Sequence, residues 1–194
     1  IGNHVKVNDI ADLIAKAKEK PGAFSYASTG VGSTSHVLTS LFEQSAQVKL
    51  LHVPYKGAAP ALQELLSGLV DIFIGDAAGI LPMVKAGKAR ALFAVDKERM
   101  EWLPELPSAP EVGLPDVYLS GEYGLVGPTG LSDSVQKSIH SALAKALSSK
   151  TVSEKFGQQF GKPVMGSGAD YKNMLDTESK RWAKVVKSGN ISLD

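Results

Sequence analysis

The residues best suited to chemistry lie in a loop at positions 28–34, Ser-Thr-Gly-Val-Gly-Ser-Thr. The loop has little side-chain bulk, and apolar residues follow it at helical spacing. The first amides of a helix have no partner within the helix, and the helix dipole favours negative charge near them. The loop therefore predicts a place for a carboxylate or a phosphate. It is equally typical of a tight strand-to-helix turn without a ligand, because glycine makes such turns at no steric cost.

Two other loops are expected beside the first. Positions 54–57 (Pro-Tyr-Lys-Gly) and 75–79 (Gly-Asp-Ala-Ala-Gly) each follow a short apolar run that suits a strand. Ligands bind outside the carboxyl ends of parallel strands, so we expect the three loops to form a small polar cup. Its candidate ligand-binding residues are Ser28, Thr29, Gly30, Gly32, Ser33, Thr34, His36, Tyr55 and Asp76.

Several of these side chains also have a structural interpretation. Ser33 suits the N-cap of the helix after the loop, and Asp76 suits the N-cap of the next but one. Tyr55 is equally typical of a half-buried aromatic residue with its hydroxyl in water. His36, one turn into its helix, suits donation to an anion or to the loop backbone, or a polar packing role. Lys56 is more typical of a solvated charge than of a carboxylate clamp.

Sequence patterns for catalysis and cofactor binding are missing. No serine lies in a G-x-S-x-G turn, and neither Gly-Lys pair is followed by Ser or Thr as in a phosphate-binding P-loop. The Gly30-Val31-Gly32 run lacks the third glycine of a dinucleotide fingerprint. No two histidines have the spacing of metal ligands on a helix. We therefore expect no catalytic residue, no cofactor and no metal ion.

Composition restricts the function further. Of 194 residues, 43% are hydrophobic and 21% charged, as in an ordinary globular protein. The 21 basic and 20 acidic side chains form no basic run longer than two residues, so we expect no nucleic-acid partner. The absence of cysteine excludes disulfides and thiolate metal sites. No apolar run approaches the roughly 20 residues that span a bilayer.

Hydrophobic periodicity predicts alternating strands and helices. We expect helices near residues 8–20, 34–44, 58–69, 77–85, 132–149, 151–160 and 168–187, with Asn8 as the first N-cap. Strands are expected near 23–27, 50–53, 70–74, 89–95, 117–126 and 163–165. A proline-rich connection at 96–116 is a candidate linker. The alternation predicts an α/β fold with a mainly parallel sheet covered by helices on both faces.

Several blocks of the sequence resemble the Bug family, the extracytoplasmic solute receptors of bacterial tripartite tricarboxylate transporters. The blocks are DLIAKAKEKPG, FSYASTGVGSTSHV, HVPYKGAAPALQELLSGLVD, KAGKARAL and LPSAPEVGLP. The resemblance implies a type II periplasmic-binding-protein fold, whose two lobes close on a small organic anion, commonly a carboxylate. It also implies a periplasmic location and a membrane permease as partner. The ligand-facing residues that it implies in the far lobe are those of the polar cup.

The resemblance also implies a division into lobes, with residues 1–120 as the far lobe and residues 121–194 as the C-terminal segment of the near lobe. Members of the family usually carry a further region before the position of Ile1, so we expect an incomplete second lobe. Because the first residue is Ile1 and not Met, we also expect a processed or cut N-terminus with any signal peptide removed. An apolar face would then be exposed, which we expect another copy (a homo-oligomer or swapped dimer) or the chain's own far lobe to cover. Its residues are Leu125, Val126, Val135, Ile139, Leu143, Leu147 and Phe156.

A second departure from the family is Glu122-Tyr123, where many members are expected to have tryptophan. Near the ligand, Glu122 would repel a second carboxylate or select a cationic or amide group. Two other functions remain open from the sequence. One is a small transferase or isomerase that binds a phosphorylated substrate, with His36, Asp76 or Glu122 as its base. The other is a pseudo-receptor that signals or scaffolds without a ligand.

Overall fold

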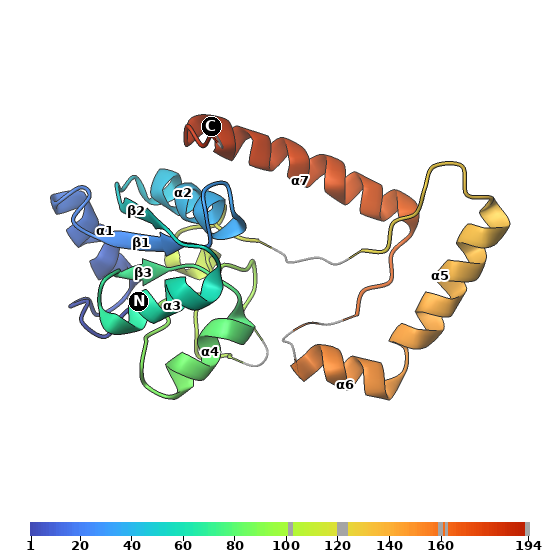
Figure 1. Cartoon of the computed structure of the whole chain (residues 1–194), viewed down its shortest axis with the longest axis horizontal. Helices are drawn as coiled ribbons and strands as arrows, with labels where there is room; N and C mark the ends of the chain where they lie inside the picture. Colours follow the sequence, from blue (N-terminus) through green and yellow to red (C-terminus); the bar gives the residue numbers. More distant parts are fainter. Residues whose placement is uncertain (101–102, 120–123, 159–160, 162, 193–194) are drawn as a thin grey trace. The chain divides into compact units, whose positions relative to one another are not determined.

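The computed structural model describes residues 1–100, 103–119, 124–158, 161 and 163–192 (Figure 1). By its internal contacts the chain divides into unit 1, Ile1–Ser120 with Lys180–Asp194, and unit 2, Gly121–Ser179. The strands are β1 (Ser25–Ser28), β2 (Leu51–Pro54) and β3 (Ile72–Phe73). The helices are α1 (Ile10–Glu19), α2 (Thr34–Ala46), α3 (Ala58–Ser67), α4 (Ala77–Lys85), the 3-10 turn η1 (Pro110–Val112), α5 (Asp133–Leu147), α6 (Lys150–Gln158) and α7 (Gly168–Ser188).

Unit 1 is built on a three-stranded sheet in the order β2-β1-β3. Both neighbours are parallel to β1, with Ser28 paired to Pro54 and Ala27 paired to Phe73. The predicted α/β fold with a parallel sheet is therefore confirmed. Because the strands are parallel, the loops that follow all three leave the same edge of the sheet.

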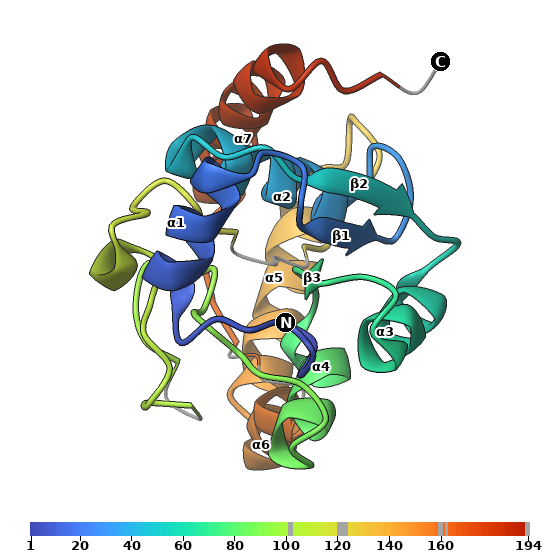
Figure 2. The same cartoon turned by 90° about the vertical axis from the view of Figure 1, so that its left-hand side faces the viewer.

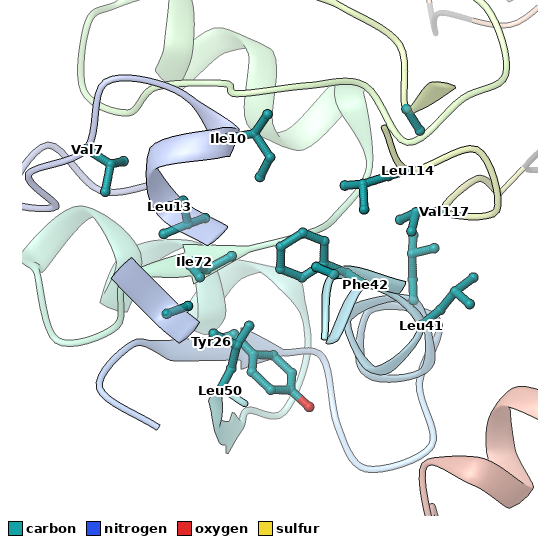
Figure 3. Packing of buried hydrophobic residues seen from close by; sticks show 14 of the residues in the cluster. Val7, Ile10, Leu13, Tyr26, Leu41, Phe42, Leu50, Ile72, Leu114 and Val117 are labelled. Atoms are coloured by element: carbon teal, nitrogen blue, oxygen red, sulfur yellow. The ribbon is translucent and has the colours of Figure 1, made fainter. Parts of the chain in front are cut away.

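Helices cover both faces of this sheet (Figures 1 and 2). Neighbouring residues of a strand point to opposite faces, so Tyr26 and Ala27 belong to two separate cores. Tyr26 lies in the larger core with side chains of α1 and α2, among them Leu13 and Phe42, as Figure 3 shows. Ala27 packs with side chains of α3 and α4, among them Leu65. The sheet is thus fixed from both sides, which holds its loop edge in place.

Residues 89–95 do not form the predicted strand. They make isolated bridges, Gly2 with Ala89 and Ala94 with Ser108, rather than a continuous ladder. Their backbone bonds go to different segments, since Arg90 N donates to Ile1 O and Ala94 N donates to Pro107 O. The apolar run therefore reflects burial against several loops, a pattern that periodicity cannot distinguish from a strand.

The predictions of strands at 117–126 and 163–165 are also wrong, as far as the structure describes these residues. Residues 117–119, 124–126 and 163–165 have no strand assignment there, and the rest of the predicted strand 117–126 lies outside the described residues. Near its start, Val117 N donates to Leu114 O within a turn. The β-branched composition of these runs was not sufficient, because no neighbouring strand pairs with them.

Helix ends follow capping residues more than periodicity. Helix α1 is capped by Asp9 and not by the predicted Asn8, because the Asp9 carboxylate accepts from Asp12 N at 2.8 Å. The amide of Asn8 in turn donates to the Asp12 carboxylate, which gives a reciprocal pair of caps. Helix α4 has the predicted bounds, and its N-cap residue is Asp76. The predicted side-chain capping bond of Asp76 is absent, which corrects that expectation.

Unit 2 contains α5, α6 and the first part of α7. Large apolar side chains are exposed in it, including Leu125 at 68%, Val126 at 75% and Val164 at 75%. Ile139 of α5 and Leu175 of α7 are also exposed. Within the described residues, no helix is long and apolar enough to cross a membrane.

The last part of α7 belongs to unit 1. Val185 is buried in its larger core, and Ser188 Oγ donates to Gln44 Oε1 of α2 at 2.6 Å. Arg181 donates to the carbonyls of Asp116 and Tyr118 and stacks on the Tyr118 ring at 3.7 Å. Within unit 1, Arg181 of α7 thus links the helix to the segment at Asp116 and Tyr118.

Candidate functional site

The loops after β1 and β2 contact each other at the edge of the sheet. Tyr55 N donates to Ser28 O at 2.9 Å, and a side chain at Gly30 would meet Tyr55 O at 3.7 Å. Gly30 also has a φ of +137°, which favours glycine. Asp76 follows β3 at the same edge, but its side chain is exposed and makes no hydrogen bond within the described structure. The structure therefore joins the first two loops of the predicted cup by a hydrogen bond, and shows no hydrogen bond from the Asp76 side chain to either of them.

Ser28 lies beneath the loop and not at its surface. The residue is fully buried, and its hydroxyl lies 2.6 Å from His52 Nε2. The same oxygen accepts from Gly30 N at 3.3 Å and lies 3.2 Å from Gly30 O. Ser28 therefore supports the loop through its neighbours.

Three hydroxyl groups form a linked cluster at the start of α2. Ser33 Oγ lies 3.1 Å from Ser35 Oγ, and Thr29 Oγ1 lies 3.2 Å from the same atom. Ser33 is the N-cap of α2, accepting from His36 N at 3.4 Å, so its predicted role as a cap is confirmed. Ser35 is buried at the centre of the cluster, and the sequence analysis did not identify it. The only signal for it was the Ser-Thr-Ser run at the helix start.

Most amides of the loop already have acceptors within the protein. Thr29 N donates to Ser35 Oγ at 2.8 Å, and Gly32 N donates to His36 Nδ1 at 3.0 Å. Gly30 N donates to Ser28 Oγ, and Ser33 N donates to Gly30 O. The loop was predicted as a place for a carboxylate or a phosphate, but these four amides are not free to bind such an anion. Short side chains with hydroxyl or imidazole acceptors satisfy the backbone of the loop locally.

The free amides that the structure describes here are one in the loop and two in the first turn of α2. Within the described structure, the amides of Val31, Thr34 and Ser35 have no hydrogen-bond acceptor. Thr34 and Ser35 are the first two residues of the helix, whose amides have no intrahelical partner. Thr34 is exposed, as the predicted role requires. The anion-binding potential of the loop is therefore concentrated at its helical end.

Three aromatic rings form a column under the loop. Tyr26 of β1 stacks on His52 of β2 at 4.8 Å between ring centroids, and His52 stacks on His36 of α2 at 4.0 Å. Burial lowers the pKa of His36. Burial, and secondarily the neighbouring His36, lower the pKa of His52 to about 4. Both imidazoles are therefore neutral at pH 7, and no charged side chain lies in the column.

Two surface depressions of unit 1, of about 350 and 490 Å³, lie elsewhere. One is lined in part by His4 and Lys88 and the other by Asn8 and Arg90, and neither includes a residue of the predicted cup. No group of potential metal ligands occurs within the described residues. Glu122 and Tyr123, for which a role in selectivity was predicted, lie outside the described residues.

Comparison with known proteins gives a consistent result. Residues 3–191 match the model of the tripartite tricarboxylate transporter family receptor. Protein BugT of Bordetella pertussis is 30% identical over 97% of this chain and 58% of its own length. A UPF0065 protein of Pseudomonas sp. (strain P51), from the tcbD-tcbE intergenic region, is 32% identical over 93% of this chain and 54% of its own. The chain thus spans little more than half the length of these relatives.

Solved structures show the same fold. R. palustris Rpa4515 with adipate is 31% identical with a TM-score of 0.83, and 98% of this chain covers 64% of it. MatC of Rhodopseudomonas palustris with bound malate is 25% identical with a TM-score of 0.76, and 92% of this chain covers 62% of it. The structure of the periplasmic binding protein BugD also matches, with a TM-score of 0.79, so the predicted periplasmic-binding-protein fold is confirmed. Together with the family match, these neighbours show that this chain belongs to the tripartite tricarboxylate transporter receptor family, the group that includes the Bug proteins.

Proposed function

We propose that this protein captures a small organic anion through a carboxylate, outside the cytoplasm, for a tripartite tricarboxylate transporter. The observation that carries the proposal is the pair of free amides at the start of α2, at the carboxyl edge of a parallel sheet, in a chain of this receptor family. Relatives solved with adipate and with malate support a carboxylate as the ligand class. A periplasmic location and a membrane permease as partner follow from the same proposal.

The proposed contacts use neutral donors. The amides of Thr34 and Ser35 would bind one carboxylate, and the positive end of the α2 dipole would favour its charge. The hydroxyl groups of Thr34 and Tyr55 would add further hydrogen bonds. His36 accepts from Gly32 N at Nδ1, so its proton lies on Nε2 and is available to donate. Recognition of this kind needs no catalytic residue, and we propose that the protein is not an enzyme.

The lobe assignment is part of the proposal. Residues 1–120 would form the far lobe, and residues 121–194 would contribute the returning segment of the near lobe. Within that segment, Lys180–Asp194 belong to unit 1 by their internal contacts.

Calorimetry with adipate and malate, together with a panel of other mono- and dicarboxylates, tests the proposal. Thr34→Pro removes the Thr34 amide, and proline is well tolerated at the first position of a helix. The preceding Ser33 has a ψ of 162°, which is compatible with a following proline. Thr34→Ala is the matched control, because it removes the side chain and keeps the amide.

We expect Thr34→Pro to weaken binding about 10- to 100-fold relative to Thr34→Ala, since a hydrogen bond to a charged group contributes about 1.5–3 kcal/mol. Equal affinity of the two variants would show that this amide does not hold the ligand. A second candidate, a pseudo-receptor, is favoured by the four loop amides that already have protein acceptors. Absence of heat from every acid would support that candidate and refute ligand capture.

We also propose that the exposed apolar side chains of unit 2 are covered by another copy of the chain or by the chain's own far lobe. Leu125, Val126 and Val164 are each more than two thirds exposed, and large exposed apolar side chains in one unit are typical of a surface that another chain or segment covers. Sedimentation equilibrium measures the molar mass, and hydrogen exchange of unit 2 reports its protection. A monomer in which the amides of this segment exchange freely would contradict both forms of the proposal.

A further inference from the structure

The ring column beneath the loop makes two hydrogen bonds to the loop itself. His52 Nε2 lies 2.6 Å from Ser28 Oγ, at the start of the loop, and His36 Nδ1 accepts from Gly32 N, near its end. The two rings stack on each other at 4.0 Å, so the column links the two contact points. Tyr26, which is buried in the larger core, supports the stack from below. The loop is therefore attached to the core through two imidazoles.

Hydrogen-bond chemistry fixes the state of one ring. Gly32 N is a donor, so His36 Nδ1 accepts and carries no proton, and the neutral ring has its proton on Nε2. A protonated His36 would place an N–H against the Gly32 N–H, and the bond would be lost. Gly32 has a φ of +72°, in the region that favours glycine, and its orientation depends on this acceptor.

We propose that His36 and His52 are the positioning residues of this loop, and that as a pair of neutral, stacked imidazoles they hold Ser28 and Gly32 in place. The loop in turn leads into α2, whose first amides remain open. The claim about the shape of the loop does not depend on a ligand. Its consequence for affinity rests on the proposed function.

Acid should weaken this arrangement. Two imidazolium rings at 4.0 Å would repel each other, and a protonated His36 would no longer accept from Gly32 N. Nearby charges offer little compensation, because Glu43 of α2 acts on Tyr26 and is itself coupled to Lys49. Burial lowers the pKa of both histidines, which keeps the pair neutral at pH 7. The loop is therefore expected to keep its shape near neutral pH and to lose it in acid.

Nuclear magnetic resonance of the 194-residue chain tests the proposal without a ligand. At pH 7 the ¹⁵N shifts should show His36 protonated at Nε2 only. As the pH falls, the Gly32 amide should shift together with the His36 ring, with a midpoint below 6.5. The amide of Leu65, in the core on the other face of the sheet, monitors global folding. If the chemical shift of the Gly32 amide did not change as His36 titrates, the proposal would be refuted.

Two variants separate the acceptor from the stack. His36→Phe keeps an aromatic ring and removes the acceptor, so exchange of the Gly32 amide should rise about tenfold, the equivalent of one hydrogen bond. His36→Asn keeps an acceptor near the position of Nδ1 and cannot titrate, so protection of Gly32 should be retained and become independent of pH. Unchanged exchange in His36→Phe, or equal loss in both variants, would refute the assignment.

Binding of adipate and malate then tests the functional consequence. If either acid binds, His36→Phe should bind at least several-fold more weakly than His36→Asn at pH 7. Equal affinities would refute the link between loop shape and binding. If the resonance measurements agree with the proposal and neither acid binds, the positioning role stands and ligand capture of these acids fails.

Discussion

Two serines that lie two positions apart at the start of α2 should differ sharply in what they contribute. Ser33 is the conventional N-cap, whereas Ser35 is buried inside the first turn. Replacing each with alanine removes one hydroxyl and changes nothing else of comparable size. We predict that Ser35→Ala destabilises unit 1 more than Ser33→Ala does.

The free energy of unfolding that each variant loses follows from the hydrogen bonds that it can no longer make. Ser35→Ala removes the acceptor of Thr29 N at 2.8 Å and leaves a partly buried amide unpaired, which costs about 1–3 kcal/mol. Ser33→Ala removes a long capping bond of 3.4 Å to His36 N, and loss of a cap costs about 0.5–1 kcal/mol at the weak end of its range. Gly30 O loses its bond from Ser33 Oγ but still accepts from Ser33 N. We therefore expect Ser35→Ala to cost about 1 kcal/mol more.

Urea unfolding followed by circular dichroism gives the free energy of unfolding of each variant, and equal m-values make the comparison valid. Ser45→Ala is the control, because Ser45 is exposed on the same helix and alanine favours helix. Amide exchange of Thr29 provides a local measure, which should accelerate in Ser35→Ala and remain unchanged in Ser45→Ala. If Ser33→Ala proved as destabilising as Ser35→Ala, the assignment of Ser35 as the acceptor for the loop would be wrong.

Three further predictions concern the framework around the site. Asp71→Ala should lower the free energy of unfolding by about 2–4 kcal/mol, because the carboxylate accepts from Ser25 N at 2.7 Å and from Ser25 Oγ at 2.8 Å. Asp71→Asn keeps an acceptor, so the free energy of unfolding should fall by about half as much. Equal losses of the two variants in urea unfolding would contradict this prediction. Arg181→Ala should accelerate hydrogen exchange in the last part of α7 more than Arg181→Lys does, because lysine keeps the charge but cannot stack as a plane on Tyr118. Identical exchange rates in the two variants would show that Arg181 does not hold the end of α7 in place. The folded-state pKa of His52, about 4, lies below its ordinary value of 6.5, so the stability from its neutral form is complete above pH 6.5 and is lost as the pH falls toward 4. At about 1.4 kcal/mol per pKa unit, and with solvent screening of this partly buried ring, the loss is about 1–2 kcal/mol. His52→Gln should remove this part of the pH dependence in urea titrations at pH 7, 6 and 5.

Local pattern was sufficient for the elements that form the sheet and its helices. The helices α2, α3 and α4 and the strands β1 and β2 occur close to their predicted positions, because their apolar spacing and their glycine or proline boundaries are local signals. The same reasoning failed for residues 89–95, which are buried against several loops without a ladder partner. Composition indicates that a segment is buried, whereas strand pairing depends on which segment lies beside it.

The candidate site shows the same division. Parallel strands placed the loops after β1 and β2 together, and Ser33 was identified as a cap from its type and position. Which amides of the loop already have a hydrogen-bond acceptor was not predictable, because this depends on where the side chains of Ser35 and His36 lie within the turn. Sequence spacing does not resolve such differences, since a displacement of less than 1 Å makes or breaks a hydrogen bond.

The sequence by itself determined a parallel α/β unit of a receptor family, with a small polar loop at the carboxyl edge of its sheet, because these features follow from local periodicity and from motifs. Only the tertiary structure decided which amides of that loop are free, and that two histidines from β2 and α2 stack beneath it. The physical reason is that these hydrogen bonds depend on where side chains lie within the turn, which sequence spacing does not resolve, and that the ring contacts depend on how β2 and α2 pack. The amides of Thr34 and Ser35 remain open at the first turn of α2, where the proposed carboxylate would bind.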